Sequence, residues 1–225
     1  MGTDQLFHKH KQRLSASFRR SSEWREQNKV ALVVCQGKRS EPNYLRGLQR
    51  ALRLPNANLM ILATGEGLDS LSVVRAGIAA YEKDATAYDR VFCIFDKDSD
   101  SHYANAVNVA RTHDLATKNV LVGINSVPCF EIWLLLHYDY TTREFAKTGN
   151  RSPCDNIITE LSKPGRITNY VKNHKGIYEV VADKTNTAIA NARRLTKYNA
   201  STKSPNASQT RMHELVTYLQ AIAPK

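Results

Sequence analysis

The sequence predicts an α/β fold, in which helices flank a mainly parallel sheet and a helical extension follows on the C-terminal side. Between about residues 30 and 124, four short apolar runs alternate with segments of helical periodicity. Such alternation is typical of parallel strands joined by right-handed helical crossovers. The runs are rich in Val, Ile and Leu, as expected of strands covered on both faces. Beyond residue 140 the chain is more polar, and its apolar residues follow helical spacing.

The first half of this pattern predicts two strands and two helices. The run at residues 30–35 is apolar and β-branched, which favours a buried strand. Pro42 stands at the start of the next segment, and proline is well tolerated in the first turn of a helix. Leucines three and four residues apart then give this helix an apolar face. The expected elements are a strand at 30–35, a helix from about 41 to 53, a strand at 59–63 and a helix at 69–83.

The second half predicts two further strands and a series of helices. The third apolar run closes at Asp96, and the fourth is followed by a strongly apolar segment that is typical of a buried helix. Residues 212–222 carry an apolar stripe at helical spacing. The expected elements are a strand at 90–95, a helix at about 101–117, a strand at 120–124, and helices at 129–138, 183–198 and 205–223.

Positive charge is concentrated at two places in a chain with a formal net charge of +11. Residues 1–30 carry seven Lys and Arg against three Asp and Glu, and residues 143–211 carry thirteen against five. We expect a basic arm at 1–28, an α/β core at 29–140 and a helical region at 141–225. Basic flanks attract phosphate backbones, although a solvated surface has the same composition. The residues expected to contact nucleic acid are Lys38, Arg39, Arg19, Arg20, Lys172, Lys175, Arg193 and Arg194.

Several classes of protein are disfavoured by composition. No apolar run approaches the roughly 18–20 residues that a membrane span requires, and the N-terminal segment lacks the apolar region of a secretory signal. The four cysteines contain no C-x-x-C pair, which disfavours a disulfide framework and a zinc site. We therefore expect a protein of the reducing cytoplasm, with no membrane association.

Carboxylates follow two neighbouring strands at the edge where parallel α/β sheets bind ligands. Asp96 and Asp98 come directly after the third strand, and an extended backbone would point both side chains the same way. Two such oxygen donors can share Mg²⁺, whereas the alternative role of these residues is in a turn or a helix cap. Glu41 follows the first strand and is either a third oxygen ligand or only a favourable acid in the first turn of a helix.

Glu131 is an acid inside an otherwise apolar helix, where an unpaired charge is costly. It is either a ligand of metal or water near Asp98, or half of a buried pair with an Arg or Lys from the C-terminal region. Either Lys184 or Lys175 is expected to supply the cation that stabilises the negative charge of the leaving group. His137 is expected to cap or pack the end of the apolar helix.

Four segments resemble motifs of the RloB-like family, in the same order along the chain. Residues 33–44 (VVCQGKRSEPNY) are similar to its opening motif (I/V)CEGxxTEpxYF, and residues 93–98 (CIFDKD) are similar to its DxD motif. Residues 125–137 (NSVPCFEIWLLLH) resemble its N-P-x-F-E-x-W-x-L-L-H segment, and residues 204–216 resemble its closing helix. The resemblance implies a Toprim fold and a Mg²⁺- or Mn²⁺-dependent nuclease of phage defence. It also implies a DNA or RNA substrate, with tRNA among the candidates, and an ATPase partner encoded nearby.

One residue departs from this pattern. The family's motif has a glutamate where this sequence has Gln36. A glutamine can coordinate Mg²⁺ through its carbonyl oxygen but cannot accept a proton as a general base. Either the chemistry has been lost or rerouted, with Glu41 compensating in part, or Gln36 is an engineered change that traps an inactive enzyme. The catalytic candidates implied by these motifs and by the charge pattern are Gln36, Glu41, Asp96, Asp98, Glu131 and Lys184; the metal candidates are Glu41, Asp96, Asp98 and Glu131.

Three functions remain open at this point. The first is the metal-dependent nuclease, and the second is a non-catalytic subunit that binds nucleic acid or an ATPase partner through a vestigial Toprim site. Retention of every candidate carboxylate favours the first. Nucleotidyl transfer of the primase type ranks third, because nothing in the chain resembles the zinc module that accompanies primases.

Overall fold

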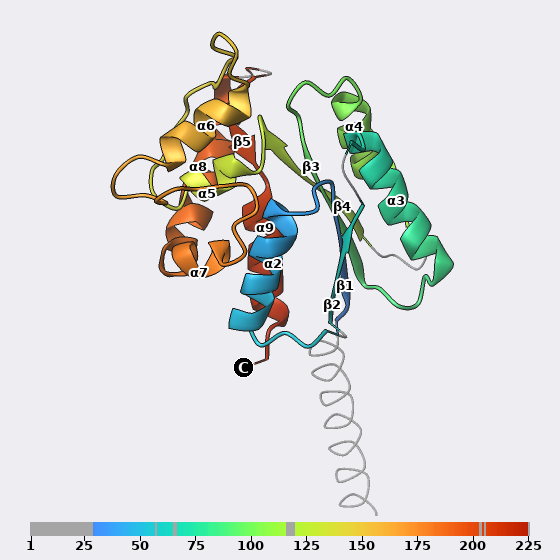
Figure 1. Cartoon of the computed structure of the whole chain (residues 1–225). Helices are drawn as coiled ribbons and strands as arrows, with labels where there is room; N and C mark the ends of the chain where they lie inside the picture. The colour runs from blue at the N-terminus through green and yellow to red at the C-terminus, as the bar shows by residue number, and fades with distance from the viewer. Residues whose placement is uncertain are drawn as a thin grey trace, which may run out of the picture.

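The computed structural model has the α/β architecture expected from the sequence (Figure 1). It describes residues 29–56, 58–64, 67–115, 120–202, 204 and 206–224. The basic arm expected at residues 1–28, with Arg19 and Arg20, lies outside the described residues. The strands are β1 (Ala31–Cys35), β2 (Leu59–Ala63), β3 (Arg90–Asp96), β4 (Val120–Val127) and β5 (Gln209–Thr210).

The sheet has the strand order β2-β1-β3-β4-β5 and is mainly parallel. β1 pairs in parallel with β2 and β3, and β3 pairs in parallel with β4. β5 is antiparallel to β4, with Ser126 opposite Thr210. Asp96 lies opposite Ser126 in the β3–β4 pair, so Asp96, Ser126 and Thr210 form one row across the sheet.

Helices cover both faces of the sheet. Figure 1 shows α3 and α4 on one face and α2 and α9 on the other, with α5 to α8 packed beyond them. The helices are α2 (Ser40–Ala51), α3 (Ser70–Lys83), α4 (Tyr103–Thr112), α5 (Glu131–Leu135), α6 (Pro153–Leu161), α7 (Ile177–Val181), α8 (Thr185–Thr202) and α9 (Met212–Ile222), with a 3₁₀ turn η2 (Ala182–Lys184) before α8. None of these helices is long and apolar enough to cross a membrane.

Two apolar clusters hold the layers together, one on each face. The larger joins alternate residues of β1 and β3, such as Val33 and Phe92, to α2, α9 and the helical region around the fully buried Trp133. The smaller joins the intervening residues, such as Val34 and Cys93, to α3 and α4. The helical region therefore packs on the core through a shared hydrophobic cluster, which fixes it beside the edge where the strands end.

Several boundaries differ from those expected. β4 continues to Val127, three residues beyond 124, and the helix expected at 129–138 is the single short helix α5. The last helix begins at Met212, because residues 209–210 pair with β4 as a strand. Helix α6 was not among the expected elements, although Ser152 begins it with a capping box to Asp155.

Candidate functional site

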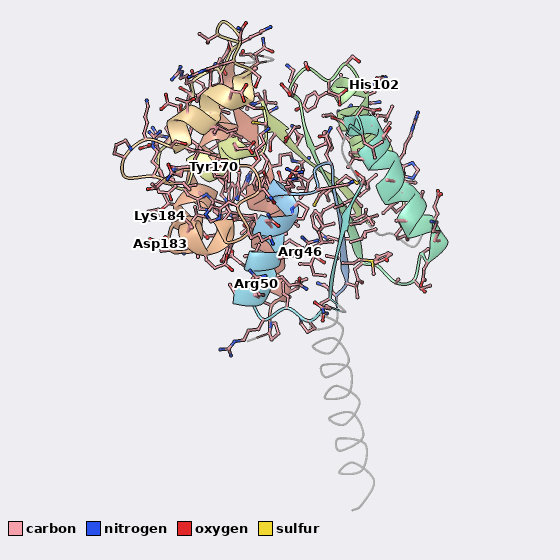
Figure 2. All side chains as sticks on the ribbon, in the orientation of Figure 1. Arg46, Arg50, His102, Tyr170, Asp183 and Lys184 are labelled. Carbon is pink, nitrogen blue, oxygen red and sulfur yellow. The ribbon has the colours of Figure 1, made fainter. Side chains whose placement is uncertain are left out.

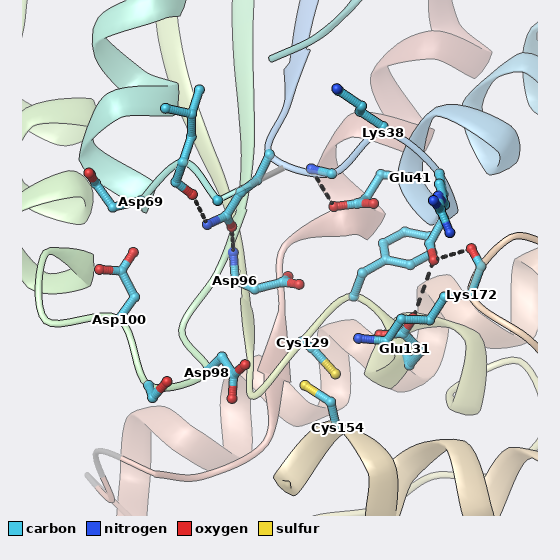
Figure 3. Close-up of a pocket in the computed structure, with 18 residues that line it drawn as sticks. Lys38, Glu41, Asp69, Asp96, Asp98, Asp100, Cys129, Glu131, Cys154 and Lys172 are labelled. Carbon is cyan, nitrogen blue, oxygen red and sulfur yellow. Dashed lines mark hydrogen bonds between the residues drawn. The ribbon is translucent and has the colours of Figure 1, made fainter. Parts of the chain in front are cut away.

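A cavity of about 620 Å³ opens where the parallel strands end (Figure 3). Its walls come from the segments that follow β1, β2, β3 and β4, together with α6 and residue 172. This is the edge at which open α/β sheets bind ligands. The residues that line it are Gln36, Gly37, Lys38, Arg39, Ser40, Glu41, Gly67, Leu68, Asp69, Asp96, Asp98, Ser99, Asp100, Cys129, Phe130, Glu131, Cys154 and Lys172.

Gln36 follows β1 and connects three segments of the cavity wall. Its side-chain Nε2 donates to the carbonyl oxygen of Leu68 at 2.8 Å, and its Oε1 accepts from the backbone N–H of Asp96 at 2.9 Å (Figure 3). The first bond fixes the segment that leads into α3, and the second fixes the end of β3. Both ends of the amide are thus used, and a carboxylate at this position could make only the second of the two bonds.

Asp96 ends β3, and Asp98 stands just beyond it. The backbone does not stay extended to Asp98, which has a φ of 30°, so the condition under which both side chains would point the same way is not met. The N–H of Asp98 instead donates to the carbonyl oxygen of Pro128 at 2.8 Å, which turns this residue along the end of β4. Both aspartates still line the one cavity, with Asp98 exposed and one carboxylate oxygen of Asp96, Oδ1, buried without a hydrogen-bond partner.

Glu41 is buried in the first turn of α2, with 5% of its surface exposed. Its Oε1 accepts from the N–H of Gly37 at 3.3 Å. Burial raises the pKa of Glu41, and the negative charge of Glu131 raises it further. Burial likewise raises the pKa of Asp96 well above its usual range, with Glu41 and Glu131 adding to the rise. The cavity therefore holds more negative charge than its surroundings stabilise.

Glu131 begins α5 and is almost fully buried. The hydroxyl of Tyr170 donates to its Oε1 at 3.1 Å, and Ser40 Oγ lies 3.3 Å from the same atom. Ser40 Oγ also donates to the backbone carbonyl of Lys172 at 2.8 Å. The hydrogen-bond partners of Glu131 are thus hydroxyl groups, and they tie it to the first turn of α2 and to the segment that carries Lys172 (Figure 3).

Lys172 brings positive charge to this acidic cavity. Burial lowers its pKa, but the opposing effect of nearby negative groups, led by Glu131, is larger and raises the pKa to about 12. Lys38 and Arg39, in the segment between β1 and α2, line the cavity as well. Three of the expected nucleic-acid contacts therefore lie beside the carboxylates.

The carboxylates have the right chemistry for a divalent cation, but they are not arranged as a finished metal site. Within the described ranges, no three His, Cys, Asp or Glu side chains converge closely enough to hold a metal ion. The buried, unpartnered Oδ1 of Asp96 and the raised pKa values of Asp96 and Glu41 nevertheless fit a site that a cation would stabilise. Oxygen donors of this kind suit Mg²⁺ or Mn²⁺.

Lys184, expected as the catalytic cation, lies away from this cavity. Its Nζ donates to Asp183 at 2.9 Å and stands over the ring of Tyr138, 5.3 Å from the centroid. Figure 2 shows Lys184 and Asp183 together on the outer side of the helical region. Lys184 contributes instead to a second cavity, of about 520 Å³, which it shares with Arg166 and His137. The role expected for Lys184 therefore fits Lys172 better.

Other expected contacts are also separate from the carboxylates. Lys175 is exposed in the segment before α7. Arg193 and Arg194 are exposed on α8, and the Arg194 guanidinium lies 3.8 Å from the centroid of the Tyr140 ring. None of these three residues lines the larger cavity. Their role in binding nucleic acid stays a prediction.

Sequence reasoning missed several residues of the cavity. Asp69 accepts from the N–H of Ser72 as the N-cap of α3, and Asp100 accepts from Ser70 N–H and His102 N–H. Asp69 and Asp100 follow β2 and β3 in the sequence, and this position could have indicated that both lie at the same edge of the sheet as the other carboxylates. The remaining lining residues with reactive or polar side chains that were missed are Ser40, Ser99, Cys129 and Cys154.

The comparisons with known proteins give one family. A family model described as RloB-like protein matches residues 31–219. No curated protein and no solved structure matches the chain. The matched range begins at β1 and ends within α9, so it includes every described residue of the cavity wall.

Proposed function

The chain belongs to the RloB-like family, and from this premise we propose that it is a metal-dependent nuclease that hydrolyses phosphodiester bonds of DNA or RNA. One observation carries the proposal. Glu41, Asp96, Asp98 and Glu131 come from three separate chain segments and line one cavity, in which Asp96 Oδ1 is buried without a partner. Bringing several buried carboxylates together is electrostatically unfavourable unless a positive charge balances them, so such a cluster is typical of a site that binds a cation.

Asp96, Asp98, Glu41 and Glu131 would hold Mg²⁺ or Mn²⁺. Such an ion supplies positive charge to the phosphate and makes water a stronger nucleophile at neutral pH. Because the side chains do not converge in their present positions, binding requires at least one of them to turn. Asp98 is exposed and is therefore the side chain that can turn most easily.

The remaining residues of the cavity would position the substrate and move a proton. Lys172, Lys38 and Arg39 offer positive charge to a phosphate that enters the cavity. The attack of water on phosphorus also requires a proton acceptor, and Glu41, which accepts a 3.3 Å bond from Gly37 N–H, is the carboxylate that we assign to this role. Gln36 cannot take this role, since its amide has no basic oxygen at neutral pH and both its ends are hydrogen-bonded.

The direct test is cleavage of DNA, tRNA and other RNA with Mg²⁺ or Mn²⁺. The unmodified chain is compared with Gln36→Glu and Asp98→Ala, and Lys184→Ala serves as a matched control outside the cavity. We expect metal-dependent cleavage that Asp98→Ala abolishes and that Lys184→Ala leaves unchanged. If even Gln36→Glu cleaves none of these substrates with either metal, the chain is not a nuclease.

A second function, a non-catalytic subunit that binds nucleic acid or an ATPase partner, is favoured by one observation. The amide of Gln36 bridges Leu68 and Asp96 and so has a structural use that requires no catalysis. This candidate predicts nucleic-acid binding without cleavage, or a stable complex with an ATPase encoded nearby. Phage defence belongs to both candidates, and its test is protection of cells by the unmodified chain. Asp98→Ala should abolish protection if the chain is a nuclease and should keep it if the chain is a non-catalytic subunit.

Binding of the phosphate backbone is tested separately from cleavage. Each phosphate neutralised steepens the fall of log K with log salt by roughly 0.7 to 0.9. Replacing Arg19 and Arg20, or Arg193 and Arg194, by Ala should therefore flatten this slope by about one to two units for every sequence tested. Should all these variants keep full affinity at every salt concentration, the basic segments do not bind nucleic acid.

A further inference from the structure

The larger cavity contains two thiols that the proposed reaction does not use. Cys129 lies between β4 and α5, and Cys154 is the second residue of α6. Both line the cavity. Figure 3 shows their sulfur atoms pointing toward one another from these two segments. Cys35 and Cys93, the other two cysteines, are buried in the apolar clusters and take no part in lining the cavity.

The two thiols share one environment, since both line the cavity and both belong to the larger apolar cluster. Burial raises the pKa of Cys129 well above its usual range, and a hydrogen bond with the Cys154 side chain raises it further. Both cysteines also contribute to the raised pKa of Lys172. The pair therefore stands next to Lys172 and Glu131, where the larger apolar cluster meets the wall of the cavity; both cysteines are almost fully buried.

We propose that Cys129 and Cys154 are a redox-sensitive site, which forms a reversible disulfide across the wall of the cavity when a small hydroperoxide enters. A cavity of about 620 Å³ admits hydrogen peroxide readily. The formation of the bond is independent of the proposed nuclease function. Its consequence for catalysis, which is inhibition, rests on that function.

The reaction balances with hydrogen peroxide as the oxidant. One cysteine sulfur attacks a peroxide oxygen, the O–O bond breaks, and the sulfur becomes a sulfenic acid while the other oxygen leaves as water with the thiol proton. The second sulfur then attacks the sulfenic sulfur, and the hydroxyl group leaves as a second water molecule with the second thiol proton. Two thiols are oxidised by two electrons in total, and one peroxide is reduced to two waters. A dithiol reductant reverses the change by exchange.

The position of the bond explains why it would inhibit. Cys129 stands two residues before Glu131, and Cys154 belongs to the first turn of α6 in the helical region. A disulfide would join the end of β4 covalently to α6, beside Glu131 and Lys172. The two walls could then no longer adjust around a phosphate or a metal ion. A misplacement of only about 1 Å in a catalytic site can cost about a hundredfold in rate, so the bond should inhibit cleavage.

The experiment treats the full chain with hydrogen peroxide, alkylates it under denaturing conditions and measures its intact mass and peptide map. We expect the number of alkylated cysteines to fall from four to two, with a cross-linked peptide that contains Cys129 and Cys154. Treatment with dithiothreitol should restore four. Cys154→Ala should lose the cross-link, whereas Cys93→Ala, which removes a thiol on the opposite face of the sheet, should retain it.

Two results would overturn the proposal. One is that all four thiols of the unmodified chain remain alkylated after peroxide, or that the bonded pair includes Cys35 or Cys93. The other is a bonded pair whose formation leaves metal-dependent cleavage unchanged, provided that the reduced protein cleaves. Because the peptide map is made on the unmodified chain, it does not depend on a variant that folds poorly. A protein that forms the bond but never cleaves would refute the nuclease function and leave the redox site standing.

Discussion

Replacement of Gln36 by Glu should destabilise the metal-free protein and make its stability depend on a divalent cation. The variant keeps the acceptor for Asp96 N–H but loses the donor to Leu68, whose carbonyl then faces a carboxylate. The bond to Leu68 is partly exposed, so its loss costs about 0.5–1.5 kcal/mol, and repulsion between the new carboxylate and the Leu68 carbonyl favours the upper end of that range. About 1.5 kcal/mol corresponds to a fall in Tm of about 3–6 °C for a domain of this size.

The same substitution adds a fifth carboxylate to the four proposed as metal ligands, beside Asp96, so a bound cation should offset the loss. A ligand at a hundred times its Kd stabilises the folded state by about 2.7 kcal/mol, which exceeds the deficit. We expect thermal unfolding of Gln36→Glu in a chelator to occur below that of the unmodified chain. Mn²⁺ should raise the Tm of Gln36→Glu by more than it raises the Tm of the unmodified chain, because the variant has the additional carboxylate, so the difference between the two should shrink.

Two matched variants separate hydrogen bonding from metal binding. Gln36→Met has a side chain of similar size but with neither donor nor acceptor, so its Tm in the chelator should be below that of the unmodified chain. Mn²⁺ should raise the Tm of this variant by no more than it raises the Tm of the unmodified chain. Combining Gln36→Glu with Asp98→Ala should remove the recovery. An unchanged Tm of Gln36→Glu in the chelator would refute the role of the amide bridge. Equal stabilisation of the Glu and Met variants by Mn²⁺ would show that residue 36 does not face the metal.

Three further predictions concern charge and packing. Burial and the neighbouring acids raise the pKa of Asp96, so the metal-free fold should lose stability as pH rises from about 4 through that raised value. Asp96→Asn should therefore have a higher Tm than the unmodified chain at pH 7.5 in a chelator. Thermal unfolding at several pH values checks this, since the difference should vanish at low pH. Lys172→Ala should lower the rate of metal-dependent cleavage by about 10²–10³-fold, and Lys172→Arg should restore part of it. A larger loss of cleavage in Lys184→Ala would contradict the assignment of the catalytic cation to Lys172. A Cβ at Gly47 would lie 2.5 Å from the Cβ of Tyr178, so Gly47→Ala should lower the free energy of unfolding by about 1–3 kcal/mol, measured with a denaturant. An unchanged denaturation midpoint would mean that α2 and α7 are not in contact at this position.

Most of the sheet could be predicted from the sequence, because β1, β3 and β4 are short apolar runs that are covered on both faces. Their parallel pairing then placed Glu41 and Asp96 at one edge without any knowledge of tertiary contacts. β5 could not be predicted in this way. It has only two residues, so no periodicity marks it, and its strand conformation depends on the edge that β4 presents.

The site was predicted in part for the same reason. Carboxylates at strand ends are positioned by the sheet itself, whereas Lys172 reaches the cavity from a segment without helix or strand, fixed by Ser40. Charge alone could not separate Lys172 from Lys184, because both lie in the same basic stretch. The backbone turn at Asp98 also required tertiary information, since its N–H bonds to Pro128 on the neighbouring segment.

The row formed by Asp96, Ser126 and Thr210 has a consequence for synthesis of the protein. β5 completes the edge of β4 at the level of Asp96, and Lys97 beside it donates to Asn206 at 2.8 Å. Arg211 adds bonds to the carbonyl oxygens of Gly123 and Asn125. A nascent chain therefore cannot complete this edge of the sheet until about residue 211 has left the ribosome. Products that stop before that point would expose an unpaired, apolar strand, which makes them prone to aggregate and to be degraded.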